Sequence, residues 1–289
     1  MVSKNLKKTL ERIVLAASIM MTPMAAKAEP IQYINRHNTS ARAAVLGANV
    51  AFGCLKAGIG SSANDKGFLN GCLKGMLGGA VAYAGEELAS HNRYPMVGAA
   101  GKLTHDLGIS VQDNVMMGEG MFSRYQTDIG PVMLTFKDSI VPRGSFTLTP
   151  AVGIAKSLLN ENKLDARQSL YNLTPVFRFS SDNLRIGSEV IPVLGVTYGN
   201  VISYSGSGEV LSHEMNHAIG WSELRFCKNI ADKVPTEKIH PSLEMEKIQR
   251  WWDIGQDVCG VVAYLPTVML NEGYYYDPAE LRAYTMQRE

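Results

Sequence analysis

The sequence predicts an α+β fold that runs from a glycine-rich helical hairpin, through a small and mostly antiparallel sheet, to a second helical region. Three changes of pattern along the 289 residues support this order. Glycine and alanine dominate residues 41–90, short β-prone runs follow between 122 and 204, and helical apolar spacing returns after Gly206. We expect loops near 227–241 and 266–277 within the last region.

The first 28 residues have the pattern of a cleaved export signal. Four basic side chains precede and flank an apolar run at 13–21, and the small residues Ala26 and Ala28 provide a cleavage site. The apolar run is much shorter than the roughly 20 residues of a membrane-spanning helix, which argues against an uncleaved anchor. We therefore expect a mature chain that lies in the periplasm or outside the cell.

Export would place the four cysteines in an oxidising compartment. Proximity along the chain favours the pairs Cys54–Cys72 and Cys227–Cys259, but four cysteines allow three different pairings. Four cysteines are too few for a disulfide scaffold in a chain of this length, so apolar packing must supply most of the core.

Residues 41–90 predict two closely packed helices joined by a polar turn at 61–66. Glycines occur on both sides of the turn, and small residues at helical spacing let two helices approach closely. A hairpin inserted in a membrane is the alternative interpretation of the same pattern. Four charged residues favour a soluble, packed hairpin over insertion: Lys56, Lys74, Glu86 and Glu87.

The predicted sheet is built from short runs of β-branched and aromatic residues bounded by Gly, Pro, Asn and Asp. These runs lie at 132–136, 145–149, 175–179 and 193–198. Their close spacing favours mostly antiparallel connections.

His213, Glu214 and His217 form the pattern H-E-x-x-H. On a helix, positions four residues apart share a face, so both imidazoles can bind one metal ion. Glu214 stands beside the first ligand, where it could act as a general base on a water bound to the metal. Chance placement gives this pattern in roughly 1% of chains with such a composition, so the surrounding sequence decides its weight.

The surrounding sequence suits a metal site. A β-prone run at 200–204 leads into a helix predicted to start near Ser207 or Gly208 and to end at Gly220. The helix has an apolar side made of Val210, Leu211, Met215, Ala218 and Ile219. In this order of strand and helix, residues 199–220 resemble the zincin metallopeptidases. The resemblance implies a zinc ion held by His213 and His217, with an extended peptide substrate beside the strand.

The resemblance also implies a third protein ligand, because a catalytic zinc usually takes three protein ligands and one water. Glu280 lies in a predicted C-terminal helix that is similar to the gluzincin arrangement, in which a later helix supplies a glutamate. Glu223 is the alternative, because the metzincin pattern places its last histidine at that spacing. We favour Glu280, although Asp277 and Glu280 also fit a helix capping box that needs no metal.

The charge balance excludes a nucleic-acid partner. The chain has 28 Lys and Arg residues against 27 Asp and Glu residues, a net charge of +1. Binding to a polyanion requires a clustered excess of basic side chains, and no such cluster occurs. A near-neutral chain is compatible with a peptide or protein substrate.

Three regions are therefore expected: a signal peptide at 1–28, a helical region at 29–115, and a zincin-like α+β domain at 116–289 with its metal site in 199–289. The favoured function is an exported zinc metallopeptidase. The alternative is a non-catalytic envelope protein that uses the glycine-rich hairpin to bind a partner or a membrane. The sequence specifies neither the cleavage preference nor the oligomeric state.

Overall fold

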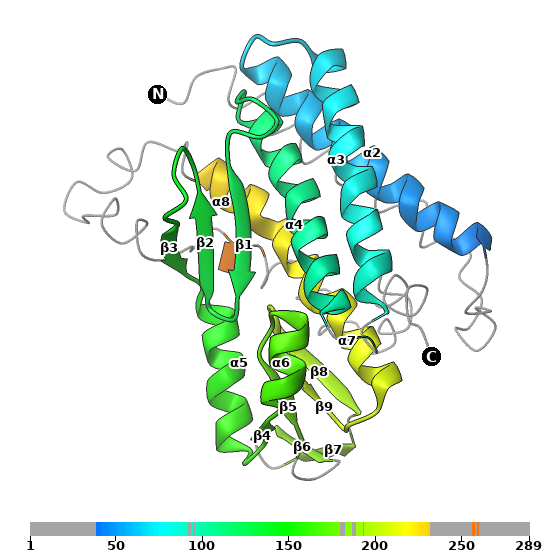
Figure 1. The fold of residues 1–289 in the computed structure, drawn as a ribbon, viewed down its shortest axis with the longest axis vertical. Coiled ribbons are helices and arrows are strands. Elements are labelled where there is room, and N and C mark those ends of the chain that lie inside the picture. The colour runs from blue at the N-terminus through cyan, green and yellow to red at the C-terminus, as the bar shows by residue number, and fades with distance from the viewer. Residues whose placement is uncertain are drawn as a thin grey trace.

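The computed structural model in Figure 1 describes residues 39–91, 94, 96–179, 183–186, 189–192, 194–231, 256–257 and 259. Three long helices come first and lie side by side: α2 (Thr39–Ala63), α3 (Phe68–Ala89) and α4 (Val97–Met116). The predicted export signal lies outside the described residues, and so does Glu280.

Three small sheets and several short helices follow. The strands are β1 (Tyr125–Ile129), β2 (Val132–Phe136), β3 (Arg143–Phe146), β4 (Lys163–Leu164), β5 (Val176–Arg178), β6 (Asn183–Ile186), β7 (Glu189–Pro192), β8 (Gly195–Tyr198) and β9 (Val201–Tyr204). The helices are α5 (Leu148–Leu159), α6 (Ala166–Asn172), α7 (Gly208–Gly220), the 3-10 helix η2 (Trp221–Leu224) and α8 (Arg225–Ala231). The mixed α+β class is confirmed.

The glycine-rich hairpin predicted from the sequence is present as α2 and α3. A Cβ atom on Gly75 would clash with the backbone carbonyl of Gly53, and one on Gly79 would clash with that of Asn49. Only glycine therefore permits this close approach of the two backbones. A disulfide between Cys54 and Cys72 links the same two helices, which confirms the pairing favoured by sequence proximity.

The helical unit extends beyond the hairpin, because α4 also packs closely against α3 through glycines. A Cβ atom on Gly85 would clash with the backbone nitrogen of His105, and one on Gly108 would clash with that of Ala82. Glycines on both helices of this second contact therefore bring α4 against α3 and complete a three-helix layer, visible in Figure 1.

Some charged side chains point into this helical layer, and several large apolar side chains of α3 point out. Lys56 and Asp113 form a buried ion pair between α2 and α4, and Glu86 of α3 is also buried. The outer face of α3 exposes Phe68, Leu69, Leu73, Met76, Leu77 and Leu88. Lys56 and Glu86 thus lie inside the bundle, so they no longer argue against a hairpin that meets a membrane.

Among the described helices, the Arg42–Ala63 part of α2 is long and apolar enough to span a membrane by length and composition.

The mostly antiparallel pairing predicted from the sequence is confirmed, but the prediction of a single small sheet is wrong. The strands form an antiparallel sheet in the order β1-β2-β3, a mixed sheet in the order β4-β5-β9-β8, and a separate β6-β7 hairpin. The pair β5–β9 is parallel. Helices α5 and α6 interrupt the strand region, so the predicted β-prone runs are distributed over separate sheets.

The strand expected at 145–149 ends early because α5 begins at Leu148. The backbone N–H groups of Leu148 and Thr149 donate to the carboxylate of Asp257, over 2.7 and 2.8 Å. Pro150 follows in the first turn, where its missing N–H costs no helical hydrogen bond. A carboxylate more than 100 residues away therefore caps this helix, at the end where a helix dipole favours negative charge.

Helix α7 lies between the mixed sheet and the helical layer. Its apolar side chains Leu211, Met215, Ala218 and Ile219 form one buried cluster with Val176, Ile202 and Tyr204 of the sheet and with Ala89 of α3. This confirms the predicted apolar side of the helix. The chain does not leave the helical path at Gly220, because η2 and α8 follow directly. The loop expected from residue 227 therefore begins no earlier than the end of α8.

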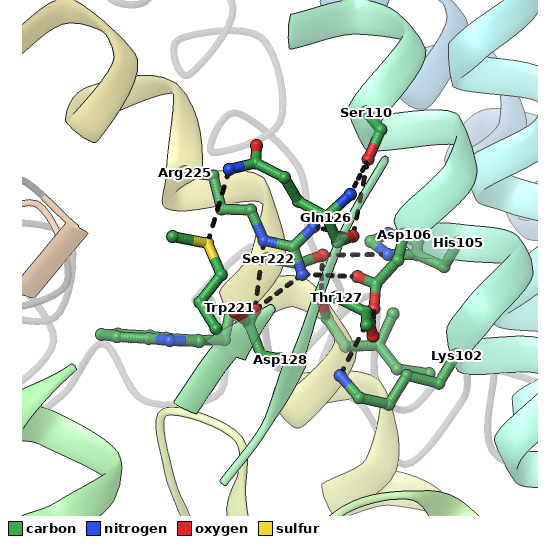
Figure 2. A network of polar contacts seen from close by, with 12 residues as sticks. Lys102, His105, Asp106, Ser110, Gln126, Thr127, Asp128, Trp221, Ser222 and Arg225 are labelled. Atoms are coloured by element: carbon green, nitrogen blue, oxygen red, sulfur yellow. Dashed lines mark hydrogen bonds and ion pairs between the residues drawn. The ribbon is translucent and has the colours of Figure 1, made fainter. Parts of the chain in front are cut away.

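A fully buried arginine joins α8 to the rest of the molecule (Figure 2). The Arg225 guanidinium contacts Asp106 of α4 at 2.7 Å and Asp128 of β1 at 2.7 Å. It also donates to the carbonyl of Gln126 over 2.8 Å. Thr127 donates to the other oxygen of Asp106 over 2.7 Å. Two carboxylates thus satisfy one guanidinium across three elements.

The close approach of α2 and α3 predicts a sharp difference between two glycine positions. We expect Gly75→Ala to lower the free energy of unfolding by about 1–3 kcal/mol, because its methyl group has no room beside Gly53. Gly47→Ala on α2 is the control, since its Cβ would meet no described atom within 4 Å. There alanine should stabilise by up to about 1 kcal/mol. Urea unfolding of both variants measures the difference; equal effects would contradict the packing.

The Arg225 network predicts the acid stability of the chain. Burial raises the pKa of Asp106. The positive charges of Arg225 and Lys102 lower it by more, so the net pKa lies below its usual range. Such a carboxylate stabilises the fold above the pKa of the unfolded chain and loses this effect as pH falls towards its folded pKa. Asp106→Asn should therefore cost about 3–5 kcal/mol at pH 7 and progressively less below about pH 4.

Urea unfolding of wild type and Asp106→Asn at pH 7 and pH 3 measures this dependence. The matched control is Glu119→Gln, which breaks an exposed ion pair with Lys137 and should change stability by less than about 1 kcal/mol. A loss in Asp106→Asn that stays constant across this pH range would contradict the assignment.

Candidate metal centres

The H-E-x-x-H residues lie together on α7. The Nε2 atoms of His213 and His217 are 3.1 Å apart, with the two rings at 73° to each other. Two imidazole nitrogens on one tetrahedral zinc, each about 2.0–2.1 Å from it, are about 3.3 Å apart. The pair therefore has the spacing that a shared ion requires, although a hydrogen bond between the two rings would suit the same distance.

The orientation of α7 follows from its packing. Its apolar side is buried in the core, and Ser212 donates to the carbonyl of Ser90 at the end of α3 over 3.1 Å. Asn216 donates to the carbonyl of Ser212 over 2.8 Å. With that side occupied, the neighbouring side of the helix carries the two histidines, of which His213 is buried and His217 is half-buried.

Glu214 is 6% exposed and lies against strand β8. Thr197 donates its hydroxyl proton to Glu214 Oε2 over 2.6 Å, which is a short, charge-assisted hydrogen bond. A Cβ atom at Gly195 would approach Glu214 Oε1 to 2.5 Å, so the glycine leaves space for the carboxylate beside the strand. Gly195 and Thr197 of β8 thus fix the position of the Glu214 carboxylate.

Among the described residues, no third metal-ligating side chain joins the two histidines. Glu280 lies outside the described residues. Glu223, the alternative, is placed on η2 and faces His105 at 3.6 Å. In the part of the chain that the structure describes, the one group of three His, Cys, Asp or Glu side chains able to hold an ion is Glu86, His105 and Glu223.

This second group lies where α3, α4 and η2 meet. His105 Nε2 is 3.5 Å from Glu86 Oε1 and 3.6 Å from Glu223 Oε1. Its other ring nitrogen, Nδ1, is 3.1 Å from the hydroxyl of Ser222, a contact that Figure 2 also shows. The three donor atoms of the group lie within 4.8 Å of one another, so this His/Glu/Glu group could hold a metal ion.

The electrostatics of the group favour a cation. Burial lowers the pKa of His105, but the carboxylates of Glu223 and Glu86 raise it by more, so that the net pKa lies above its usual value. Two carboxylates around one fully buried ring therefore favour a positive charge at that point.

Sequence reasoning missed this group. His105 belongs to no motif in the sequence, and a lone histidine usually lies on the surface or in a satisfied polar pocket. Its partners come from separate elements, Glu86 nineteen residues before it on α3 and Glu223 far along the chain on η2. The local signal was weak, because one histidine and one glutamate on neighbouring helices have no characteristic spacing.

Comparisons of the chain with models of protein families, with curated proteins and with solved structures found no match.

The contact between Thr197 and Glu214 can be tested by two similar substitutions. Thr197→Val keeps the shape of the side chain but leaves the buried carboxylate without this donor, so we expect a loss of about 1–3 kcal/mol in the free energy of unfolding. Thr197→Ser keeps the hydroxyl and should retain most of the stability. Urea unfolding compares the two; a Thr197→Val variant as stable as Thr197→Ser would contradict a contribution of this hydrogen bond.

Proposed function

We propose that this chain is an exported zinc metallopeptidase that hydrolyses peptide bonds, with His213 and His217 as zinc ligands and Glu214 as the general base. The observation that carries the proposal is the convergence of the two Nε2 atoms at 3.1 Å on the helix that also presents Glu214. The spacing fits two ligands of one tetrahedral ion. Glu280 stays the proposed third ligand.

The chemistry needs the residues of this motif, a third ligand and one ion. A zinc ion held by these residues would lower the pKa of a water at the site and would polarise the scissile carbonyl. Glu214 would accept the proton of that water and later donate it to the leaving amine. Thr197 would keep the carboxylate oriented through its hydrogen bond to Oε2.

Strand β8 supports a peptide substrate. It lies at the edge of the sheet in the order β4-β5-β9-β8, as far as the described strands extend. An edge strand offers unpaired backbone groups with which an extended peptide can pair. Because Glu214 packs against Gly195 and Thr197 of this strand, a peptide added to the edge would run past the proposed base.

One observation favours the alternative, a non-catalytic envelope protein that acts through its hairpin. The outer face of α3 exposes a stripe of large apolar side chains along nearly its whole length: Phe68, Leu69, Leu73, Met76, Leu77 and Leu88. Contiguous apolar surfaces of this kind mark interaction sites for partners or membranes. The retained Glu214 favours the peptidase, because a structural metal site needs no base.

The peptidase proposal predicts separable effects of two substitutions. His217→Ala should lose the zinc held by the histidine pair, measured by elemental analysis of the purified mature chain beside wild type. Glu214→Gln should keep that zinc and lose hydrolysis of a peptide library by at least about 100-fold, because the base is absent. The control is Glu209→Gln, which changes a glutamate in the first turn of the same helix and should leave both zinc content and hydrolysis unchanged.

Unchanged hydrolysis in Glu214→Gln would refute the assignment of the base. Zinc content that His217→Ala leaves unchanged would refute the metal site. A wild-type chain that keeps zinc, cleaves no peptide and binds lipid vesicles would support the envelope-protein alternative instead.

A further inference from the structure

We propose that Glu86, His105 and Glu223 form a second metal site, which binds a divalent transition-metal ion such as Zn²⁺ and ties α3, α4 and η2 together. This inference goes beyond the proposed peptidase function and does not depend on it. It concerns residues that the H-E-x-x-H motif does not include, and its role is structural.

The hydrogen bonds of Ser222 assign the tautomer of His105. The Ser222 hydroxyl lies 2.9 Å from the carbonyl of Ile219, which can only accept, and 3.1 Å from His105 Nδ1. A hydroxyl has one proton. When that proton goes to the carbonyl, the oxygen accepts from Nδ1–H, and the neutral ring then carries its lone pair on Nε2.

The Nε2 atom of His105 faces two carboxylates. His105 is fully buried, and its Nε2 makes no hydrogen bond to the described residues. The nearest charged atoms are Glu86 Oε1 and Glu223 Oε1, at 3.5 and 3.6 Å. A neutral nitrogen acceptor that faces two carboxylates is unfavourable in a buried environment. A proton on Nε2 or a metal ion between the three atoms removes the conflict, and the metal ion is the cation that we propose.

The donor set selects the kind of cation. One imidazole nitrogen with two carboxylate oxygens suits zinc and similar first-row ions, whereas Ca²⁺ and Mg²⁺ prefer oxygen ligands alone. The measured separations of 3.5 and 3.6 Å exceed the about 3.3 Å of a tetrahedral site by a few tenths of an ångström. The three donor atoms lie within 4.8 Å of one another, so a bound ion would draw the two glutamate side chains closer together. The Glu223 side chain is 22% exposed, which gives an ion a route from solvent.

The second site is separate from the histidine pair because it lies on a different side of the same helical run. Glu223 and Ser212 are eleven residues apart, about three helical turns, and both face α3 and α4. His213 and His217 lie on the neighbouring side of α7. An ion held by Glu86, His105 and Glu223 would fix the end of α7 to the helical layer, two turns beyond the catalytic motif.

The test separates the two sites by stoichiometry. In a His217→Ala background, we expect the chain to keep about one equivalent of Zn²⁺ after loading and exhaustive dialysis. Adding His105→Gln or Glu223→Gln should remove it. His91→Gln is the matched control, because that ring contacts the carbonyl of Glu87 at the end of α3 and should leave the equivalent bound.

A second measurement guards against variants that fail to fold. With the His217→Ala chain, Zn²⁺ at a hundredfold excess over its Kd should raise Tm by roughly 5 °C, and Glu223→Gln should abolish this rise. Circular dichroism of the zinc-free Glu223→Gln chain should match that of the parent.

The outcomes are distinct. One equivalent of zinc that remains in His217→Ala and is lost on adding His105→Gln or Glu223→Gln supports the second site. Two equivalents in the wild-type chain then support the histidine pair as well, whereas a single equivalent in the wild-type chain, unchanged by His217→Ala, overturns the peptidase proposal alone. A His217→Ala chain that binds no zinc and shows no rise in Tm overturns the second site, and His105 is then an imidazolium held by the two carboxylates. Zinc retained in both His105→Gln and Glu223→Gln overturns it as well.

Discussion

The buried guanidinium of Arg225 is the interaction on which the arrangement of the molecule depends. It contacts Asp106 of α4 and Asp128 of β1 while its own helix follows directly from α7 and η2. Three parts of the chain that are far apart in sequence thus share one cation, and none of them can move without exposing an unpaired charge in the interior. The helical layer and the strand-rich region are joined here by charge pairing as well as by apolar packing.

The same constraint orients the candidate sites. Because Arg225 anchors the end of the α7–η2–α8 run, and the apolar side of α7 is buried against the mixed sheet, the rotation of α7 about its axis is determined. One side of the run then carries His213 and His217, and another carries Glu223 towards His105. Close helix packing through glycine brings α3 and α4 near enough for Glu86 to reach His105.

Patterns within short stretches of sequence predicted much of this structure. The hairpin of α2 and α3, the strand Val132–Phe136 and the helix Gly208–Gly220 follow from spacing that is visible locally. The sheet order, the early start of α5 and the His105 group did not, because each depends on a partner far along the chain. Asp257 caps α5 from over 100 residues away, and no local signal announces such a contact. The histidine pair was predictable for the opposite reason, since one helix holds both rings.

The disulfide between Cys227 and Cys259 has a consequence for the order of maturation. It ties the segment that contains Asp257 to α8, two residues from the carboxylate that caps α5. In a reducing compartment this disulfide is absent. Bringing Asp257 to the start of α5 then costs more chain entropy, because a longer stretch of chain must be ordered. Oxidation thus holds the cap of α5 in place, and the final packing of this helix is coupled to the redox state of the compartment in which the chain folds.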